Sequence, residues 1–187
     1  MTHSSAPAAS PSATVWDFDP AHTLVEFSAR HMMVATVKGR FTSVRGRIID
    51  VADDPAQSSV EAEIDAASLD SREERRDGHL KSADFLDVEH FPSITFTSTR
   101  VQPLGGDRLR ITGDLQIRGT SRPVTFEASL NGRGKTPYGT EIAGFSAEAQ
   151  INRKDWGLNW NVALESGGLL VGETVKITIE LEAVKQS

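Results

Sequence analysis

Apolar and polar residues alternate with a period of two along most of this chain. Between residues 24 and 31, for example, Val25, Phe27 and Ala29 share one face and polar or charged residues share the other. Further stretches with this pattern are 60–65, 94–96, 108–118, 124–130, 143–151 and 175–182. Such alternation is typical of half-buried strands, and short turns such as Asn131-Gly132 separate several of them. The sequence therefore predicts an all-β fold of about eight antiparallel strands.

The residues on the apolar faces indicate how these strands assemble. Eight amphipathic strands can close into a barrel that holds one ligand, although a packed two-sheet sandwich has the same pattern. Many residues on these faces are small: Ala29, Ala62, Gly113, Ala128, Ala143, Ala147 and Ala149. Small residues favour a barrel with a cavity, but they also occur where a neighbouring segment packs closely. We expect an eight-stranded antiparallel, lipocalin-like barrel with a cavity, and a solid core is the alternative.

A charged segment of different character, residues 70–91, interrupts the strands. Ser71 precedes Glu74 by three residues, which is the spacing of a helix capping box, and Pro92 favours an extended exit. The segment predicts a short helical insert, anchored through Leu80 and Phe85. Such an insert is either a lid over the cavity or a plug in one end of the barrel, and we expect the cavity to open beside it.

Two groups of residues are candidates for binding a ligand inside the barrel. The first is apolar and faces inward by alternation: Val25, Phe27, Ala29, Phe41, Ile64, Phe96, Leu115, Phe126, Phe145 and Ala147. Taken singly, each of them fits an ordinary core position better, and only their small combined volume favours the wall of a cavity. The second group is broad and adaptable apolar surface near a cavity mouth, namely Met33, Trp156 and Trp160. The tryptophans could instead anchor the end of the barrel or form a subunit contact.

Polar candidates for a ligand head group lie at a strand end and on the insert. His31 has the same parity as Val25 and Phe27, so it points inward if the strand is regular. Arg75 and His79 share a helix face, and together with Arg76 they could clamp an anionic head. The alternatives are a His31 bonded to backbone and arginines that pair with nearby carboxylates in solvent.

Composition narrows the function classes. The 187 residues suit one domain at 16–187, and residues 1–15, rich in Ser, Ala and Pro, predict a disordered tail without an export signal. We accordingly expect a cytoplasmic protein. The net charge of −6 gives no reason to bind nucleic acid, no run suits a membrane span, and there is no cysteine. Neither a metal-ligand spacing nor a nucleophile or phosphate-loop motif is present, so we expect no metal, no cofactor and no catalytic residue.

Several fragments of the chain match a known family in order and spacing. They are 22–27, 30–31, 37–41, 76–87, 91–96, 113–119, 123–124, 153–158 and 171–177. Over residues 16–184 the chain resembles the YceI-like family. The resemblance implies a lipocalin-like barrel that binds a long-chain amphiphile, such as a polyisoprenoid, an isoprenoid quinone or a fatty-acid derivative, often as a homodimer. The chain departs from many relatives in carrying Phe85-Leu86 where they have two aromatics.

The function expected from the sequence is therefore binding, sequestration or transport of such an amphiphile inside the barrel. One alternative is a solid barrel that acts as an interaction or stress-associated module without a small ligand. The other is an enzyme acting on isoprenoid or quinone-like substrates.

Overall fold

The computed structural model describes residues 12–187, so residues 1–11 of the predicted disordered tail lie outside the described residues. The first strand begins at Ala13, earlier than the predicted domain boundary at residue 16. The strands are β1 (Ala13–His31), β2 (Ala35–Phe41), β3 (Val44–Val51), β4 (Ser59–Asp65), β5 (Leu69–Asp70), β6 (Ser93–Gly105), β7 (Arg108–Ile117), β8 (Thr120–Lys135), β9 (Glu141–Asn152) and β10 (Val171–Lys185). The helices are α1 (Glu74–Lys81) and the short 3-10 helices η1 (Pro55–Gln57), η2 (Ala66–Ser68) and η3 (Arg153–Trp156).

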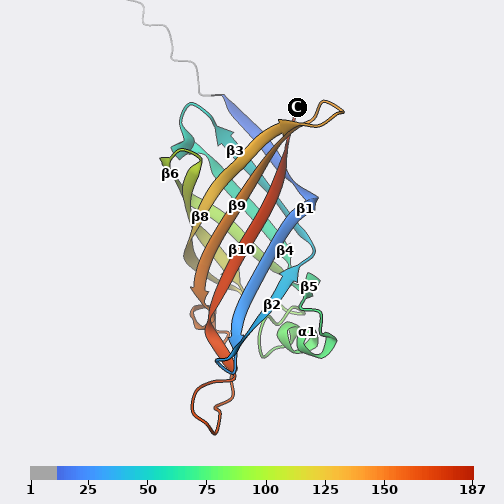
Figure 1. The fold of residues 1–187 in the computed structure, drawn as a ribbon, viewed down its shortest axis with the longest axis vertical. Helices are drawn as coiled ribbons and strands as arrows, with labels where there is room; N and C mark the ends of the chain where they lie inside the picture. Colours follow the sequence, from blue (N-terminus) through green and yellow to red (C-terminus); the bar gives the residue numbers. More distant parts are fainter. Residues whose placement is uncertain (1–11) are drawn as a thin grey trace, which may run out of the picture.

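These strands form one antiparallel sheet that closes into a barrel (Figure 1). Their order is β10-β9-β8-β7-β6-β4-β3-β1-β2-β5, and β10 also pairs with β1. The N-terminal part of β1 pairs with β3 and its C-terminal part pairs with β2, so β2 and β3 follow each other along one side of β1. In the same way β4 pairs with β3 and β5 pairs with β2. The barrel therefore has eight strand positions around its axis, as the sequence predicts.

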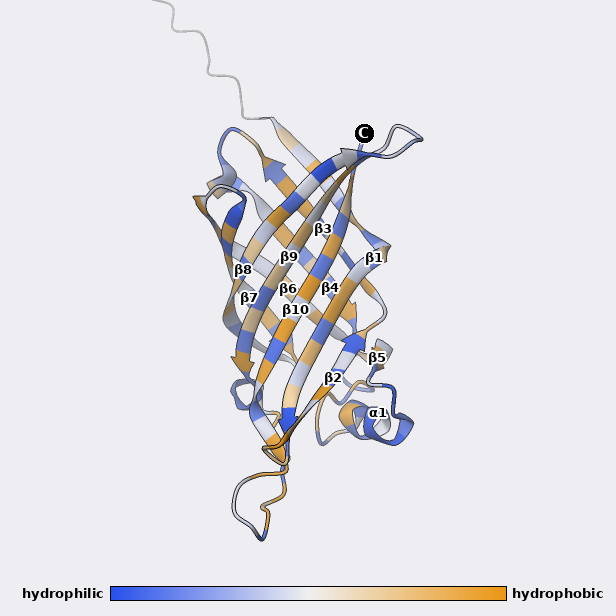
Figure 2. Cartoon of the chain, viewed as in Figure 1, coloured by the Kyte–Doolittle hydropathy of each residue, from blue (hydrophilic) through white to orange (hydrophobic). Residues whose placement is uncertain are grey.

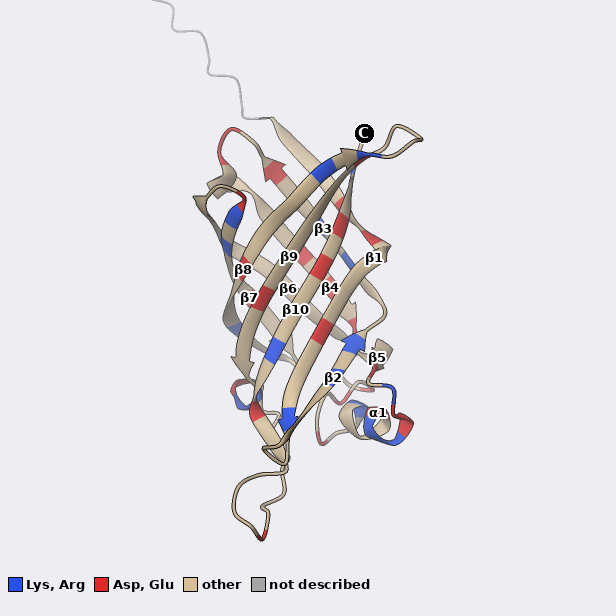
Figure 3. Ribbon diagram, viewed as in Figure 1, with Lys and Arg blue, Asp and Glu red and all other residues tan. Residues whose placement is uncertain are grey.

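The alternation in the sequence places apolar side chains inside and charged side chains outside. On β8, Val124, Phe126 and Ala128 are buried while the residues between them are exposed. Bands of opposite hydropathy alternate along the strands in Figure 2, and Figure 3 shows residues of both charge signs spread along the strands. No helix in residues 12–187 is long and apolar enough to cross a membrane.

Three glycines within the strands lie directly beneath phenylalanine rings. A Cβ atom on Gly39 would collide with the Phe27 ring, one on Gly46 with the Phe18 ring, and one on Gly113 with the Phe96 ring. Gly39 sits opposite Phe27 in an unbroken ladder between β1 and β2. The Phe27 ring therefore packs over Gly39. It fills the part of the cavity wall that the glycine, which has no side chain, leaves empty.

The helical insert exists, but it is capped differently from the prediction. Glu73 is the N-cap, and its carboxylate accepts hydrogen bonds from the backbone N–H groups of Arg75 (3.1 Å) and Arg76 (2.7 Å). Ser71 lies two residues before this N-cap, so it is too early to cap the helix. Arg72, between Ser71 and Glu73, takes a left-handed conformation with φ +62°. The predicted capping box from Ser71 to Glu74 is therefore wrong, although the short helix that it announced is present.

Candidate functional site

The barrel encloses a cavity of about 530 Å³ that is bordered by residues from both ends of the molecule. Its wall contains all ten residues of the predicted apolar group, Val25, Phe27, Ala29, Phe41, Ile64, Phe96, Leu115, Phe126, Phe145 and Ala147. Leu80 and Phe85 of the insert also border it. The interior is therefore hollow and apolar, which is the setting expected for an apolar ligand. That these residues bind a ligand remains a prediction.

Aromatic pairs stiffen the cavity wall. The ring centroids of Phe27 and Phe41 lie 5.6 Å apart, and those of Phe96 and Phe126 lie 5.3 Å apart with the rings nearly perpendicular. Both spacings fall in the range in which aromatic side chains attract each other. Phe27 and Phe41 lie on the neighbouring strands β1 and β2, whereas the Phe96–Phe126 pair joins β6 to β8 across β7.

The upper end of the barrel, where β1 begins and β10 ends (Figure 1), has polar and exposed residues on the cavity border. Arg133 donates to Asp50 at 3.0 Å, and its guanidinium carbon lies 5.0 Å from the centre of the Trp16 ring. Asp107 is exposed on the same rim. In residues 12–187 the indole N–H of buried Trp16 has no hydrogen-bond partner. This end therefore joins the cavity to solvent.

The lower end is closed by segments that are not strands. Phe85 and Leu158 are buried there, and Leu80 and Leu86 of the insert are half-buried against the cavity. The guanidinium of Arg118 donates to the Phe85 carbonyl at 3.0 Å and so ties the insert to the barrel. The insert acts as a plug in this conformation, and the cavity reaches exposed residues at the opposite end from the entrance that the sequence predicts.

Arg153, in η3, is a buried cation at this closed end. Its side chain borders the cavity and is 3% exposed. It donates to the carbonyls of Gly172 (2.9 Å), Leu158, Trp160 (3.0 Å) and Val171 (3.3 Å). Burial lowers the pKa of its guanidinium. Arg153 therefore holds the loop between η3 and β10 in place against the barrel.

Two predicted site residues lie away from the cavity. His31 is exposed because it is the last residue of β1, next to the turn that leads into β2. Its ladder with β2 is unbroken, so His31 keeps the parity of Val25 and Phe27, but it lies at the end of the strand and does not border the cavity. Met33 is 65% exposed in the following turn, with φ +63°, and packs against Gly168.

The predicted head-group clamp on the insert is not formed. Arg76 donates to the side chain and the carbonyl of Ser71, both at 2.8 Å, and Arg75 is exposed. His79 hydrogen-bonds to Asp84 at 2.9 Å. Arg76 and His79 are absent from the cavity border in the described part of the chain, so the placement of a clamp there is wrong. The cause is local, since each side chain finds its partner within the insert.

The two predicted tryptophans support the plug from outside the cavity. The His79 ring lies edge-on to the Trp160 ring at 4.4 Å, and Phe85 lies 5.5 Å from the same ring. Trp156 is buried and donates its indole N–H to the Leu115 carbonyl at 2.9 Å. Neither Trp156 nor Trp160 borders the cavity, which favours the alternative that they anchor the end of the barrel.

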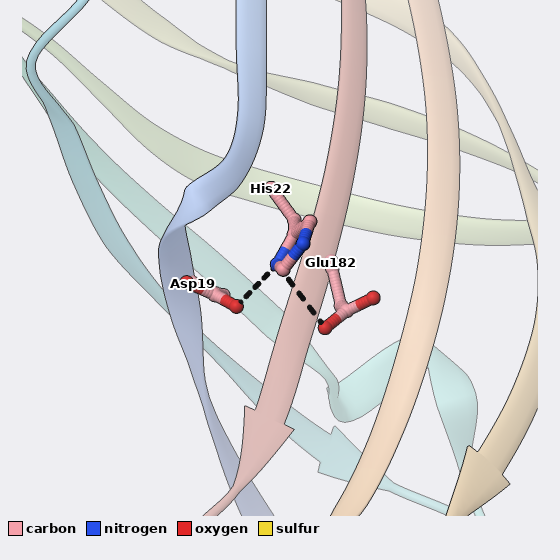
Figure 4. A group of neighbouring side chains, drawn as sticks. All are labelled: Asp19, His22 and Glu182. Atoms are coloured by element: carbon pink, nitrogen blue, oxygen red, sulfur yellow. Dashed lines mark hydrogen bonds and ion pairs between the residues drawn. The ribbon is translucent and has the colours of Figure 1, made fainter. Parts of the chain in front are cut away.

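A polar cluster on the outer surface joins β1 to β10. His22 hydrogen-bonds to Asp19 at 2.7 Å and lies 3.7 Å from Glu182, so the imidazole stands between two carboxylates (Figure 4). The hydrogen bond to Asp19 and the charge of Glu182 raise the pKa of His22, and the hydrogen bond from His22 lowers the pKa of Asp19. These three residues have the spacing of a metal-binding group. Sequence spacing missed the cluster because Glu182 comes from the last strand.

The sequence reasoning also missed three residues at the ends of the cavity. Trp16 lies before residue 24, where the predicted alternation of the first strand begins. Arg133 lies after residue 130, where the predicted alternation of β8 ends. Arg153 begins the fragment 153–158 that matches the family, but the residues around it in the sequence did not indicate that it is buried. An arginine within a match to a family motif was the available signal.

Comparison with known proteins agrees with this geometry. Residues 16–183 match the YceI-like domain. A UPF0312 protein from Staphylococcus aureus (strain MSSA476) is 35% identical over 170 residues, which are 90% of this chain and 96% of that protein.

Two solved structures share the fold. The crystal structure of Burkholderia cenocepacia BcnA is 24% identical, covers 88% of this chain and 98% of its own, and has a TM-score of 0.77. A polyisoprenoid binding domain from Saccharophagus degradans, implicated in plant cell wall breakdown, is 14% identical, covers 90% and 97%, and has a TM-score of 0.65. The match to the domain over nearly the whole barrel, together with the S. aureus relative, shows that the chain belongs to the YceI-like family.

Proposed function

We propose that this protein binds a long-chain amphiphile inside its barrel and sequesters or carries it. The observation that supports the proposal is a single apolar cavity that borders both the exposed upper rim and the buried plug. Each CH₂ group buried in such a cavity contributes about 0.8 kcal/mol, so a long chain can be held without many polar contacts. The S. degradans neighbour, described as a polyisoprenoid binding domain, supports a ligand of this class.

The proposal covers polyisoprenoids, isoprenoid quinones and fatty-acid derivatives, and it assigns no catalytic role to the protein. It includes a cytoplasmic location and a homodimer, both of which are expectations from the sequence and the resemblance. Cell fractionation and light scattering of the purified protein test these two points.

The direct test is to extract the purified protein with organic solvent and identify the bound lipid by mass spectrometry. Ala147, which borders the cavity on β9, offers a variant that fills the space, and Ala147→Trp should remove most of the bound lipid. The same substitution at exposed Gln150, on the outer face of the same strand, is the matched control and should leave the lipid in place.

Unfolding in urea checks that both variants remain folded, because an added side chain in a packed interior costs about 1–3 kcal/mol. Undiminished lipid in folded Ala147→Trp would place the ligand elsewhere. Extracts without any lipid, together with no uptake of added lipids, would favour an interaction module without a small ligand.

A further inference from the structure

Two arginines border the cavity, one at each end, and their charges are compensated differently. At the upper end the Arg133 side chain is 47% exposed and pairs with Asp50 at 3.0 Å. At the lower end Arg153 is 3% exposed. Among the ion pairs of residues 12–187, none includes Arg153.

The hydrogen bonds of Arg153 satisfy its geometry but leave its charge uncompensated. An arginine side chain has five N–H donors, and four of those on Arg153 point to neutral carbonyl oxygens. One hydrogen on Nη2 remains available. The charge of Glu173 acts on Arg153, but that carboxylate already pairs with Lys154 at 2.6 Å.

The surroundings of Arg153 make a missing anion costly. The Phe85 ring centre lies 5.8 Å from its guanidinium carbon, and buried Leu158 also borders the cavity here. A buried cation in apolar surroundings is destabilising unless it is paired, whereas a charge-assisted hydrogen bond to an anion is strong. An anionic group at this end of the cavity would supply the negative charge that the protein does not place beside Arg153.

We propose that Arg153 binds the head group of the ligand, that this head carries one negative charge on oxygen, as a carboxylate does, and that the chain runs up the barrel towards Trp16. This inference rests on the function proposed above. One uncompensated charge and one available donor suit a monoanion. A pyrophosphate carries more charge than this site can neutralise, and the arginines of the insert do not border the cavity.

The first test compares stearic acid with methyl stearate, which has nearly the same chain and no charge, at a pH where the acid is ionised. The wild-type protein should bind the acid about tenfold or more tightly, in line with the strength of hydrogen bonds to charged groups. Arg153→Gln should remove this preference, while Arg133→Gln, the control at the opposite end, should retain it.

The second test reads the orientation of the chain and leaves Arg153 intact. The three tryptophans of the protein divide between the ends, with Trp16 in β1 at the upper end and Trp156 and Trp160 near the plug. Bromine quenches indole fluorescence at close range. Stearic acid brominated at its terminal carbon should quench the wild type, and Trp16→Phe should abolish that quenching. Stearic acid brominated beside the carboxylate should quench the wild type and Trp16→Phe to a similar extent.

The outcomes separate this inference from the proposed function. Equal binding of acid and ester by the wild type, or quenching of Trp16→Phe by terminal bromine, would overturn the role of Arg153 and leave amphiphile binding standing. Binding of neither lipid would count against the function itself. Should Arg153→Gln fail to fold, the wild-type comparison and the quenching pattern still decide the matter.

Discussion

The two ends of the barrel are built from different kinds of segment. The upper end consists of strand ends and hairpins, so rim residues such as Asp107 and Arg133 are exposed. The lower end gathers the insert, η3 and the loop that follows η3, and Phe85 and Trp156 are buried there. Regular strands therefore make the wall of the barrel but do not seal it. Sealing one end needs irregular segments, and these also supply the buried cation.

The largest expected effect comes from breaking the sealed end. Trp156→Ala should lower the free energy of unfolding by about 3–5 kcal/mol, because it removes a large buried side chain and leaves the Leu115 carbonyl without its donor. Urea unfolding measures this loss. The control is Tyr138→Ala in the upper hairpin, where the side chain is 96% exposed and a change within about 0.5 kcal/mol is expected. Equal losses at the two sites would contradict the difference between the ends.

A smaller effect concerns how firmly the plug is held. The helix α1 has no buried residue, so its amides should exchange hydrogen about tenfold faster or more than those of β7, and bound lipid should slow them. Arg76→Ala should speed exchange in the insert further, because it removes two hydrogen bonds to Ser71. Exposed Arg75 provides the matched control, and Arg75→Ala should leave the rates unchanged.

Exchange as slow in α1 as in β7, and insensitive to lipid, would mean that the plug never opens. The ligand would then enter through the upper rim. Faster exchange that lipid suppresses would instead support the entrance beside the insert that the sequence predicts.

The smallest expected effect on stability comes from the polar cluster where β1 pairs with β10 and closes the barrel. The pKa of His22 is raised above 6.5 in the folded protein, so the stability from its protonated form is present below that pH and is lost as pH rises through the raised pKa. The pKa of Asp19 is lowered below 3.8, so its contribution is present above that pH and is lost as pH falls through the lowered pKa. The hydrogen-bonded pair of His22 and Asp19 therefore adds most to the stability of the folded protein between pH 3.8 and pH 6.5.

Thermal unfolding across this pH range should show a small maximum that His22→Ala flattens. Because the imidazole is exposed, the effect will be modest and will shrink at high salt. A His22→Ala protein with an unchanged pH profile would show that the cluster contributes nothing to closure of the barrel.

The wall of the cavity could be predicted from the sequence, whereas its ends could not. Phe126 and Ala147 were placed by alternation alone, because one buried face fixes the parity of a strand. His31 keeps that parity but does not border the cavity, because alternation does not show where a strand passes the end of the barrel. Arg153 was missed because its burial depends on a loop that returns from Leu158 to Val171, and Arg76 was misjudged because Ser71 takes its donors. Contacts of this kind depend on tertiary structure and produce no periodic pattern of apolar and polar residues in the sequence.

Closure of the barrel between β1 and β10 has a consequence for how the protein is made. Trp16 pairs with Lys185, so the seam joins the first strand to the last. During synthesis, β1 must wait with an unpaired edge until residues 171–185 have emerged from the ribosome. Contacts between segments so distant in sequence form slowly, and exposed strand edges invite association between chains. The cavity therefore comes into existence last, and until then the nearly complete sheet is open along one edge where another chain could pair.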